Sequence, residues 1–341
     1  LSSEFKTIGV SGTHGKTTTS TMLSHVLNNT KGCNYFIGDG SGFADRKNKL
    51  FTLESCEFNR HFLSYHPYYA IVTNIELEHT ECYKDINEII EAFSSFANKA
   101  RVVVACGDDS NVRRMKVNNK VTYYGFNDDN DVVAKNIKLS KDGSSFDVYI
   151  DGNFYNHFDI PLFGDHMILD ALACITICNM EGVKKEDVAS LLLTFKNAKR
   201  RFKETTFGDV VVIDDYAHHP TEIRVTIESA RKKYNDKKIV ALFLPNTYSR
   251  TKALMKDFIS ALKEADKAYV MDIHCDRERQ EDYEGVSSDE IINNVPNAEK
   301  ISMDSVQKLL EYKNAAICFM SCTNIYEIED KFKELLENKN N

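Results

Sequence analysis

Hydrophobic positions follow two alternating spacings along most of the chain, and these predict strands and helices in turn. Runs of consecutive apolar residues, the pattern of buried strands, occupy 6–11, 69–74 and 101–106. Apolar residues at helical spacing occupy 17–27 and 86–100. Strands that alternate with helices predict an α/β fold with a mostly parallel sheet covered on both faces.

The pattern changes in the middle of the chain. Short alternating segments separated by turn residues predict a small antiparallel patch over 121–160, appended to the first domain. Helical spacing resumes at 165–180 and 185–195, and a polar, basic stretch without periodicity follows at 197–208. We therefore expect a domain boundary near Thr205, between domains spanning 1–205 and 206–341.

A second α/β series follows this boundary and predicts a Rossmann-like C-terminal domain. The expected strands are 210–213, 239–244, 267–273 and 315–320, and the expected helices are 220–233 and 251–265. The Lys- and Asn-rich end of the chain is expected to fray.

Bulk composition narrows the class of protein. The 341 residues suit two domains, and the net charge of −8 argues against non-specific nucleic-acid binding. Nine cysteines occur without a zinc-binding pattern, so reduced core thiols are expected. Since no apolar run is long enough to cross a bilayer and no signal peptide is visible, we expect a cytoplasmic protein without membrane contact.

One segment carries clear chemistry. The residues GTHGKTTT occupy 12–19, between a predicted strand and a predicted helix. Glycines let backbone amides surround phosphate oxygens, and a helix N-terminus favours bound anions. A lysine can contact the outer phosphates while a hydroxyl holds Mg²⁺. The first glycine of the eight-residue Walker spacing is absent, because Val10 stands there, so the loop has the shorter GTxGKT form. The segment predicts a site for ATP and Mg²⁺.

Several segments together resemble the Mur ligase family. Besides the phosphate loop, these are LESCEFNRHFLSYHPYYAIVTNIELEH at 53–79, RRF at 200–202, DYAHHP at 215–220 and PNTYSRT at 245–251. DYAHHP is typical of the muramate-using branch of the family. The resemblance implies a central ATPase domain and a mobile C-terminal domain, expected to follow a uridine-nucleotide-binding domain that this sequence does not include.

The resemblance also implies roles for matching positions. Those implied to contact ATP are Gly12, Thr13, Gly15, Lys16, Thr17, Thr18, His166, Asp170, Arg201 and Asp215. Those implied to ligate Mg²⁺ are Thr17, Glu54 and His79. Those implied to be catalytic are Lys16, Asn74, His79, Arg201, His219 and Arg250.

Other positions depart from the family pattern. Glu78 replaces an aspartate, Asn246 a histidine, and Met167 and Asp170 two asparagines near the adenine. A glycine turn is replaced at 321–324. Methionine cannot hydrogen-bond adenine as asparagine does, so weak discrimination between ATP and GTP is expected.

The implied reaction is ATP-dependent amide formation in peptidoglycan precursor synthesis. The carboxylate of UDP-N-acetylmuramate would become an acyl phosphate, and the amine of L-alanine would then displace phosphate. Two alternatives stay open from the sequence: a recycling ligase of the same branch that attaches a tripeptide, and a nucleotide-binding chain without ligase activity.

Overall fold

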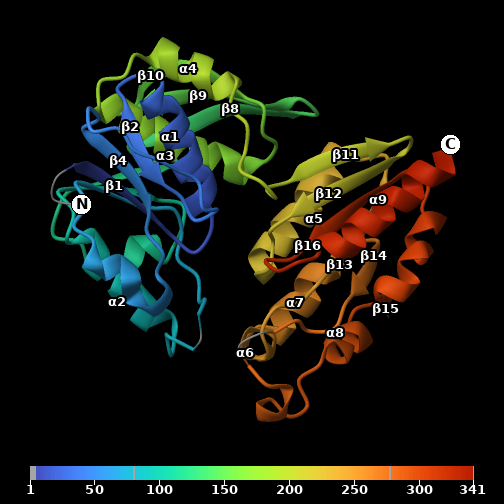
Figure 1. Ribbon diagram of the computed structural model, residues 1–341. Coiled ribbons are helices and arrows are strands. Elements are labelled where there is room, and N and C mark those ends of the chain that lie inside the picture. Colours follow the sequence, from blue (N-terminus) through green and yellow to red (C-terminus); the bar gives the residue numbers. More distant parts are fainter. Residues whose placement is uncertain (1–4, 80, 276–277, 341) are drawn as a thin grey trace. The chain divides into compact units, whose positions relative to one another are not determined.

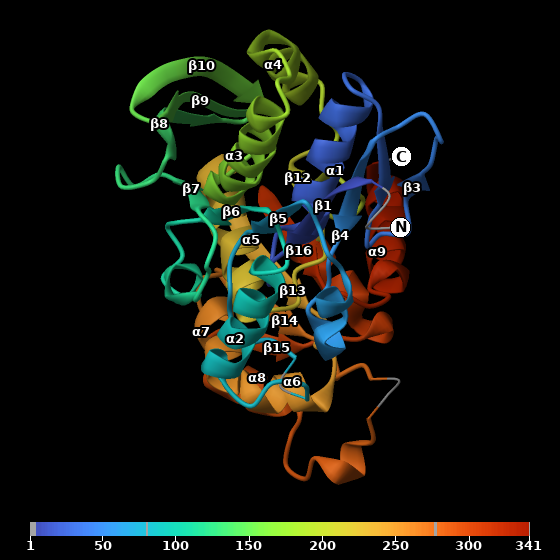
Figure 2. The ribbon, with the colours of Figure 1, turned by 90° about the vertical axis from the view of Figure 1, so that its left-hand side faces the viewer.

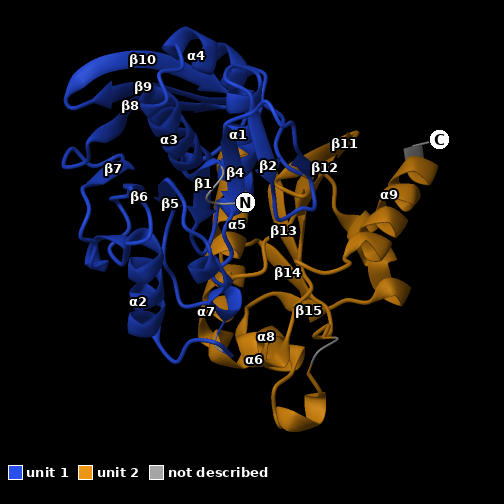
Figure 3. Ribbon diagram, turned by 60° about the vertical axis from the view of Figure 1, so that its left-hand side comes forward, with its two compact units in different colours: residues 1–198 blue, residues 199–341 orange. Residues whose placement is uncertain are grey.

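The computed structural model describes residues 5–79, 81–275 and 278–340, which form two compact units (Figures 1 and 3). Unit 1 is Leu1–Ala198 and unit 2 is Lys199–Asn341. The division comes slightly before the boundary expected at Thr205. The reason is that Lys203–Phe207, which has no clear periodicity in the sequence, forms strand β11 and pairs with the next strand of unit 2.

Unit 1 is built on one ten-stranded sheet, in the order β10-β9-β8-β7-β6-β5-β1-β4-β2-β3. Neighbouring strands pair in parallel from β8 to β2, that is, along β8-β7-β6-β5-β1-β4-β2. The bounds are β1 Lys6–Ser11, β2 Cys33–Phe36, β3 Gly42–Phe43, β4 Leu50–Glu54, β5 Tyr69–Val72, β6 Val102–Cys106, β7 Val121–Gly125, β8 Val132–Ser140, β9 Gly143–Ile150 and β10 Asn153–Ile160. The antiparallel patch expected over 121–160 is antiparallel only from β8 to β10, which continue this sheet. Its first segment, β7, pairs in parallel with β6 and β8, so the expectation was wrong there.

Helices cover both faces of the central strands, as a buried parallel sheet requires. On one face lie α1 (Lys16–Asn28), α3 (Asp165–Met180) and α4 (Lys185–Leu193), packed on residues such as Ile8 and Val10. Figures 1 and 2 both show α1 beside α3. On the other face, α2 (Ile86–Ala97) and the 3₁₀ segment η1 (Phe58–Ser64) pack on β5 and β6. A short 3₁₀ turn, η2, spans Val112–Arg114.

Unit 2 has a six-stranded sheet, in the order β11-β12-β16-β13-β14-β15. Its other strands are β12 Val210–Asp215, β13 Lys238–Phe243, β14 Lys267–Val270, β15 Ala298–Lys300 and β16 Ala315–Met320. One face packs on α5 (Pro220–Lys233), α7 (Met255–Leu262) and α8 (Ser288–Asn294). The other packs on η4 (Met303–Glu311) and α9 (Tyr326–Asn340). The remaining elements are α6 (Tyr248–Ala253) and η3 (Gln280–Asp282).

One expectation for unit 2 was wrong in detail. The helix expected over 251–265 is two helices, α6 and α7, divided at Leu254. The chain ends in helix α9, which is held by the buried side chains of Ile328 and Phe332; the Lys- and Asn-rich end that follows them is exposed at 337–339.

The state of the cysteines and the hydrophobicity of the helices complete the description of the fold. All nine cysteines are free thiols, including the buried pair Cys174 and Cys178, whose sulfur atoms lie 4.0 Å apart in α3. Over the described residues, no helix combines the length and apolar character that crossing a membrane requires.

Candidate nucleotide-binding site

The phosphate loop connects β1 to α1 and depends on two glycines with positive φ. Gly12 has φ 141° and Gly15 has φ 81°, a region that favours glycine. A Cβ atom at Gly12 would lie 1.8 Å from Thr73 Oγ1, and one at Gly15 would lie 2.5 Å from Asp170 Oδ1. Both positions therefore need glycine for backbone freedom and also for space.

Asn74, two residues after the end of β5, hydrogen-bonds to the phosphate loop. Its Oδ1 accepts from the His14 amide at 2.8 Å, and its Nδ2 donates to the His14 carbonyl at 3.1 Å. Its backbone carbonyl accepts from the Thr13 amide at 3.1 Å. Because these two loop amides already donate within the protein, a bound phosphate would be held by later amides. The first turn of α1, which starts at Lys16, supplies N–H groups with no partner inside the helix.

Lys16 lies at the base of the loop, with its side chain 13% exposed. Its ammonium donates to the carbonyl oxygens of Gly12 and Thr13, the latter at 2.9 Å. It also lies 3.2 Å and 3.1 Å from the two carboxylate oxygens of Glu57. Burial disfavours the charged ammonium, but Glu57 and nearby acidic groups outweigh burial and raise the pKa of Lys16. The side chain stays protonated, which a phosphate-binding lysine requires.

Glu57 joins Lys16 to His79. Glu57 is 1% exposed, and its Oε1 lies 3.6 Å from His79 Nε2. Burial alone would raise the pKa of Glu57, but Lys16 and His79 lower it below its ordinary value. Burial also opposes protonation of His79, yet Glu57 and Glu81 raise its pKa to about 9. The result is one buried carboxylate between two cations.

Glu54 lies at the end of β4 and touches the first turn of α1. Its Oε1 accepts from Thr17 Oγ1 at 3.3 Å, and its Oε2 accepts from the Gly38 amide at 2.8 Å. The positions expected to ligate Mg²⁺ (Thr17, Glu54 and His79) therefore lie at one end of the sheet. The sequence analysis missed Glu57. The signal was present, because Glu57 is a second carboxylate three residues after Glu54 in the same motif.

Asp170, expected from the sequence to contact ATP near the adenine, makes contacts within the protein that bring it to the phosphate loop. Its Oδ1 accepts from Thr19 Oγ1 at 2.9 Å, and the same oxygen borders Gly15. Met167 is also buried, with its sulfur 3.9 Å from Asn197 Nδ2. His166 is half-buried in the first turn of α3, and Thr18 is buried in the first turn of α1. In this structure Asp170 joins α3 to the phosphate loop.

Arg201 and Asp215 both belong to unit 2. Asp215 accepts from the backbone amides of Phe202 and Ala217, each at 2.8 Å, and Arg201 lies over the Tyr216 ring at 4.9 Å. Burial raises the pKa of Asp215 to about 6, although Arg201 and the two amides oppose the change. The neighbouring Arg200 is buried and bonded to Asp214 and to two backbone carbonyls, so its contacts are structural.

The other two predicted residues of unit 2 are at helix starts. His219 is 5% exposed and forms the N-cap of α5, where its Nδ1 accepts from the Thr221 amide at 3.3 Å. Glu222 completes a capping box by accepting from the His219 amide at 3.2 Å. Arg250, in α6, lies 3.3 Å from Asn246 Oδ1.

A strand, a glycine-containing phosphate loop and a helix, with a lysine and paired carboxylates, define the class of nucleotide-binding α/β proteins. Family comparison adds the identity: residues 10–178 match the Mur ligase middle domain, and residues 200–318 match the Mur ligase glutamate ligase domain. The chain belongs to the Mur ligase family, ATP-dependent ligases that form amide bonds in peptidoglycan precursor synthesis.

Solved structures with the same fold include several members of this family. The UDP-N-acetylmuramate–alanine ligase MurC of Thermotoga maritima has a TM-score of 0.79 at 23% identity, over 98% of this chain and 76% of its own. The murein peptide ligase of Psychrobacter arcticus has a TM-score of 0.69 at 21% identity, covering 98% and 78%. MurF of Thermotoga maritima, solved with ADP, has a TM-score of 0.79 at 17% identity, covering 98% and 81%.

Proposed function

We propose that this chain joins L-alanine to the carboxylate of UDP-N-acetylmuramate at the expense of ATP. The observation that carries the proposal is the segment 215–220, DYAHHP, which forms the turn between β12 and α5. In it, Asp215 bonds to backbone amides on both sides, and His219 caps α5. The segment is the one that resembles the muramate-using branch.

The chemistry divides into two balanced steps. A carboxylate oxygen attacks the γ-phosphorus of ATP, forming an acyl phosphate and releasing ADP. The amine of L-alanine then attacks the acyl carbon, the carbon–oxygen bond to phosphate breaks, and the amine loses a proton as the amide forms. Phosphorylation is needed because a carboxylate has no good leaving group. Lys16 would neutralise charge on the outer phosphates, and Asn74 would hold the loop in place around them.

The donor set at the phosphate loop fits a magnesium ion. Thr17, Glu54 and Glu57 offer a hydroxyl and two carboxylates, and Mg²⁺ prefers oxygen ligands. His79, the third expected ligand, is protonated beside Glu57 and would offer a ring nitrogen to the cation only after losing its proton. Glu57 Oε2 is buried and accepts no well-directed hydrogen bond, although Lys16 Nζ lies near it. Such an atom suits a cation. When bound, Mg²⁺ would neutralise phosphate charge.

The proposed reaction also assigns roles to the remaining predicted residues. Arg201 and Asp215 would serve the nucleotide from unit 2, while His219 and Arg250 would face the sugar acid and the amine. His166 would lie on the adenine side. Glu57 joins the set as a proposed magnesium ligand, because it contacts both Lys16 and His79.

Phosphate release from ATP tests the proposal on the protein in its natural full length. With UDP-N-acetylmuramate present, L-alanine should stimulate release, and a tripeptide ending in a diamino acid should not. Stimulation by the tripeptide alone would identify the recycling ligase. ATP binding without release under either condition would identify a nucleotide-binding protein and contradict the proposal.

A variant of Lys16 provides the matched control. Lys16→Met should lower the rate by about 100-fold or more, and should weaken ATP binding more than AMP binding, because Lys16 serves the outer phosphates. It also leaves Glu57 buried beside His79 alone, which destabilises the fold. Lys16→Met with Glu57→Gln should recover stability without recovering activity, which separates lost chemistry from lost folding.

A further inference from the structure

One edge of the unit 1 sheet has an apolar face that the helices leave uncovered. In β4 and β2, Leu50 and Cys33 point into the core beneath α1, so Phe51, Leu53 and Phe36 belong to the opposite face. Within the described residues, neither core cluster of unit 1 includes these three side chains. Parallel sheets usually have both faces covered, so this strip is an exception.

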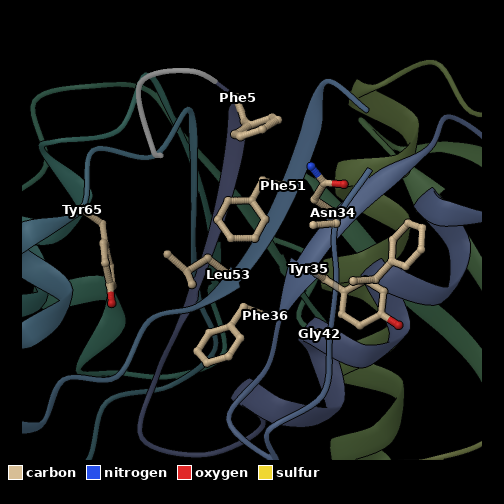
Figure 4. A pocket seen from close by; sticks show the side chains of 10 residues that line it. Phe5, Asn34, Tyr35, Phe36, Gly42, Phe51, Leu53 and Tyr65 are labelled. Atoms are coloured by element: carbon tan, nitrogen blue, oxygen red, sulfur yellow. The ribbon is translucent and has the colours of Figure 1, made fainter. Parts of the chain in front are cut away.

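A pocket of about 710 Å³ lies on this face (Figure 4). Its lining residues include six aromatic ones, Phe5, Tyr35, Phe36, Phe43, Phe51 and Tyr65. Tyr35 lies two positions after Cys33 in β2 and stacks with Phe43, so these two rings belong to the α1 face, and the rings of Phe5, Phe36, Phe51 and Tyr65 remain for the pocket. Phe36 is 58% exposed and Phe43 is 43% exposed, so part of the lining is open to solvent. The volume falls within the usual range for small-molecule sites, which are mostly apolar with a few fixed polar groups. None of the lining residues carries a charge, which disfavours phosphate or carboxylate groups.

Asn34 supplies one fixed polar group. It is 5% exposed, and its Oδ1 accepts from the Asp45 amide at 2.8 Å and from Asn48 Nδ2 at 2.9 Å. Because a backbone amide can only donate, these contacts determine which atom of the Asn34 amide is oxygen. The Nδ2 donor is left on the other side. No described residue accepts a hydrogen bond from it, and Figure 4 shows it turned toward the rings of Phe5 and Phe51.

We propose that this pocket binds a small, uncharged, planar aromatic molecule that carries a carbonyl acceptor. Flat rings would stack against the aromatic lining, and the carbonyl would accept from Asn34 Nδ2. An aliphatic ligand would not use the ring faces, and a ring without an acceptor would cover the Asn34 Nδ2 donor without satisfying it. The pocket shares no lining residue with the phosphate loop, so this inference stands independently of the proposed ligase activity.

Coumarin and naphthalene make a matched pair of probes. Each has two fused six-membered rings, but only coumarin has a carbonyl. In an NMR titration of the protein with each probe, coumarin should bind about tenfold more tightly, a ratio equal to about 1.4 kcal/mol. The amide signals that shift should come from β2, β3 and β4.

Three variants sharpen the test. Asn34→Asp keeps an oxygen for the Asp45 amide but removes the donor, so it should abolish the preference for coumarin. Phe36→Ala should weaken the binding of both probes severalfold. Because Phe36 is mostly exposed, the fold should tolerate this substitution. Phe154→Ala, at a phenylalanine with 56% exposure in β10 of the same unit, should change neither affinity.

Specific results would overturn the proposal. These are equal binding of the two probes, an unchanged preference in Asn34→Asp, or signal shifts confined to other elements. Sedimentation velocity provides an independent check. A dimer that Phe36→Ala dissociates, together with no probe binding, would make this face a contact between two copies and would exclude a ligand site.

Discussion

Asp215 illustrates how single side chains in unit 2 are held by the backbone around them. Its two oxygens accept from amides on either side of the β12–α5 connection, and its pKa is raised to about 6 because of burial. Arg200 lies fifteen positions earlier in the chain and is also buried. It donates a hydrogen bond to Asp214, the neighbour of Asp215 in β12. The geometry is therefore set by contacts within the unit before any nucleotide is present.

This raised pKa predicts a stability change with pH. The folded-state pKa of Asp215 lies above the ordinary value of about 3.9, so the folded state binds the proton more tightly. The resulting stabilisation is complete below about pH 4 and is lost as the pH rises through 6. Since Asp215 keeps some exposed surface, solvent screening reduces the effect to about 1–2 kcal/mol.

Urea unfolding between pH 4 and 7 measures this effect. Asp215→Asn should be less stable overall, because it loses one acceptor, but should also show a flatter pH dependence than the natural protein. Asp236→Asn, at an exposed carboxylate of unit 2, is the control and should leave the pH dependence unchanged. Parallel curves for Asp215→Asn and the natural protein would contradict a raised pKa.

At the scale of elements, the packing of α3 on α1 links the phosphate loop to the core. Asp170 reaches from α3 to Thr19 in α1 and lies against Gly15 in the loop. The sequence hypothesis placed Asp170 at the adenine, where its loss of amide donors would affect discrimination between bases. The observed contacts favour a positioning role, in which Asp170 acts on the loop that surrounds the phosphates.

The two roles predict different nucleotide titrations. If Asp170 positions the loop, Asp170→Ala and Thr19→Val should each lower the affinities for ATP and GTP by the same factor. Each should also destabilise the protein by about 1–3 kcal/mol. The double variant should lose less stability than the sum of the two single losses, since the two side chains hydrogen-bond to each other. Asp170→Asn, which keeps the acceptor, should retain stability.

A change in the ratio of ATP to GTP affinity would instead support base contact. The earlier expectation is that Met167→Asn with Asp170→Asn raises ATP affinity and leaves GTP affinity nearly unchanged; the contacts of Asp170 argue for equal changes. Asp165→Asn, at an exposed carboxylate in the same helix, serves as the control.

At the scale of the whole molecule, the division into units decides which segments fold together. β11 pairs along its full length with β12, and Arg200 bonds to Asp214 and to the carbonyl oxygens of Ser321 and Thr323. These contacts place the segment after Ala198 in unit 2. The sequence pattern placed it in the first domain, because its polar residues show neither helical nor strand spacing.

Two fragments test the division. A fragment of residues 199–341 should unfold cooperatively in urea, whereas 206–341 should be less stable by at least about 2 kcal/mol, because it lacks Arg200 and most of β11 and so leaves buried Asp214 without its partner. Equal stability of the two fragments would show that the boundary near Thr205 is adequate after all.

The sequence by itself determined the α/β class and most of the elements with strong patterns, such as β1, α3, α5 and β16. It also located the phosphate loop, because glycines, a lysine and hydroxyls at this spacing act locally, within a single strand–loop–helix segment. The family follows from such local motifs.

Only the tertiary structure decided the features that depend on distant residues. The fold brings Lys16 and His79 to Glu57, which makes Glu57 a candidate site residue. The packing of α3 on α1 gives Asp170 a contact with Thr19, which favours a positioning role over contact with the adenine. β11 and α9 form because sheet pairing and core burial stabilise segments whose own sequence patterns are weak. The aromatic pocket forms where β2, β3 and β4 meet at an edge of the sheet that no core cluster of the described chain covers. The sequence pattern of a strand does not indicate which of its faces a helix will cover.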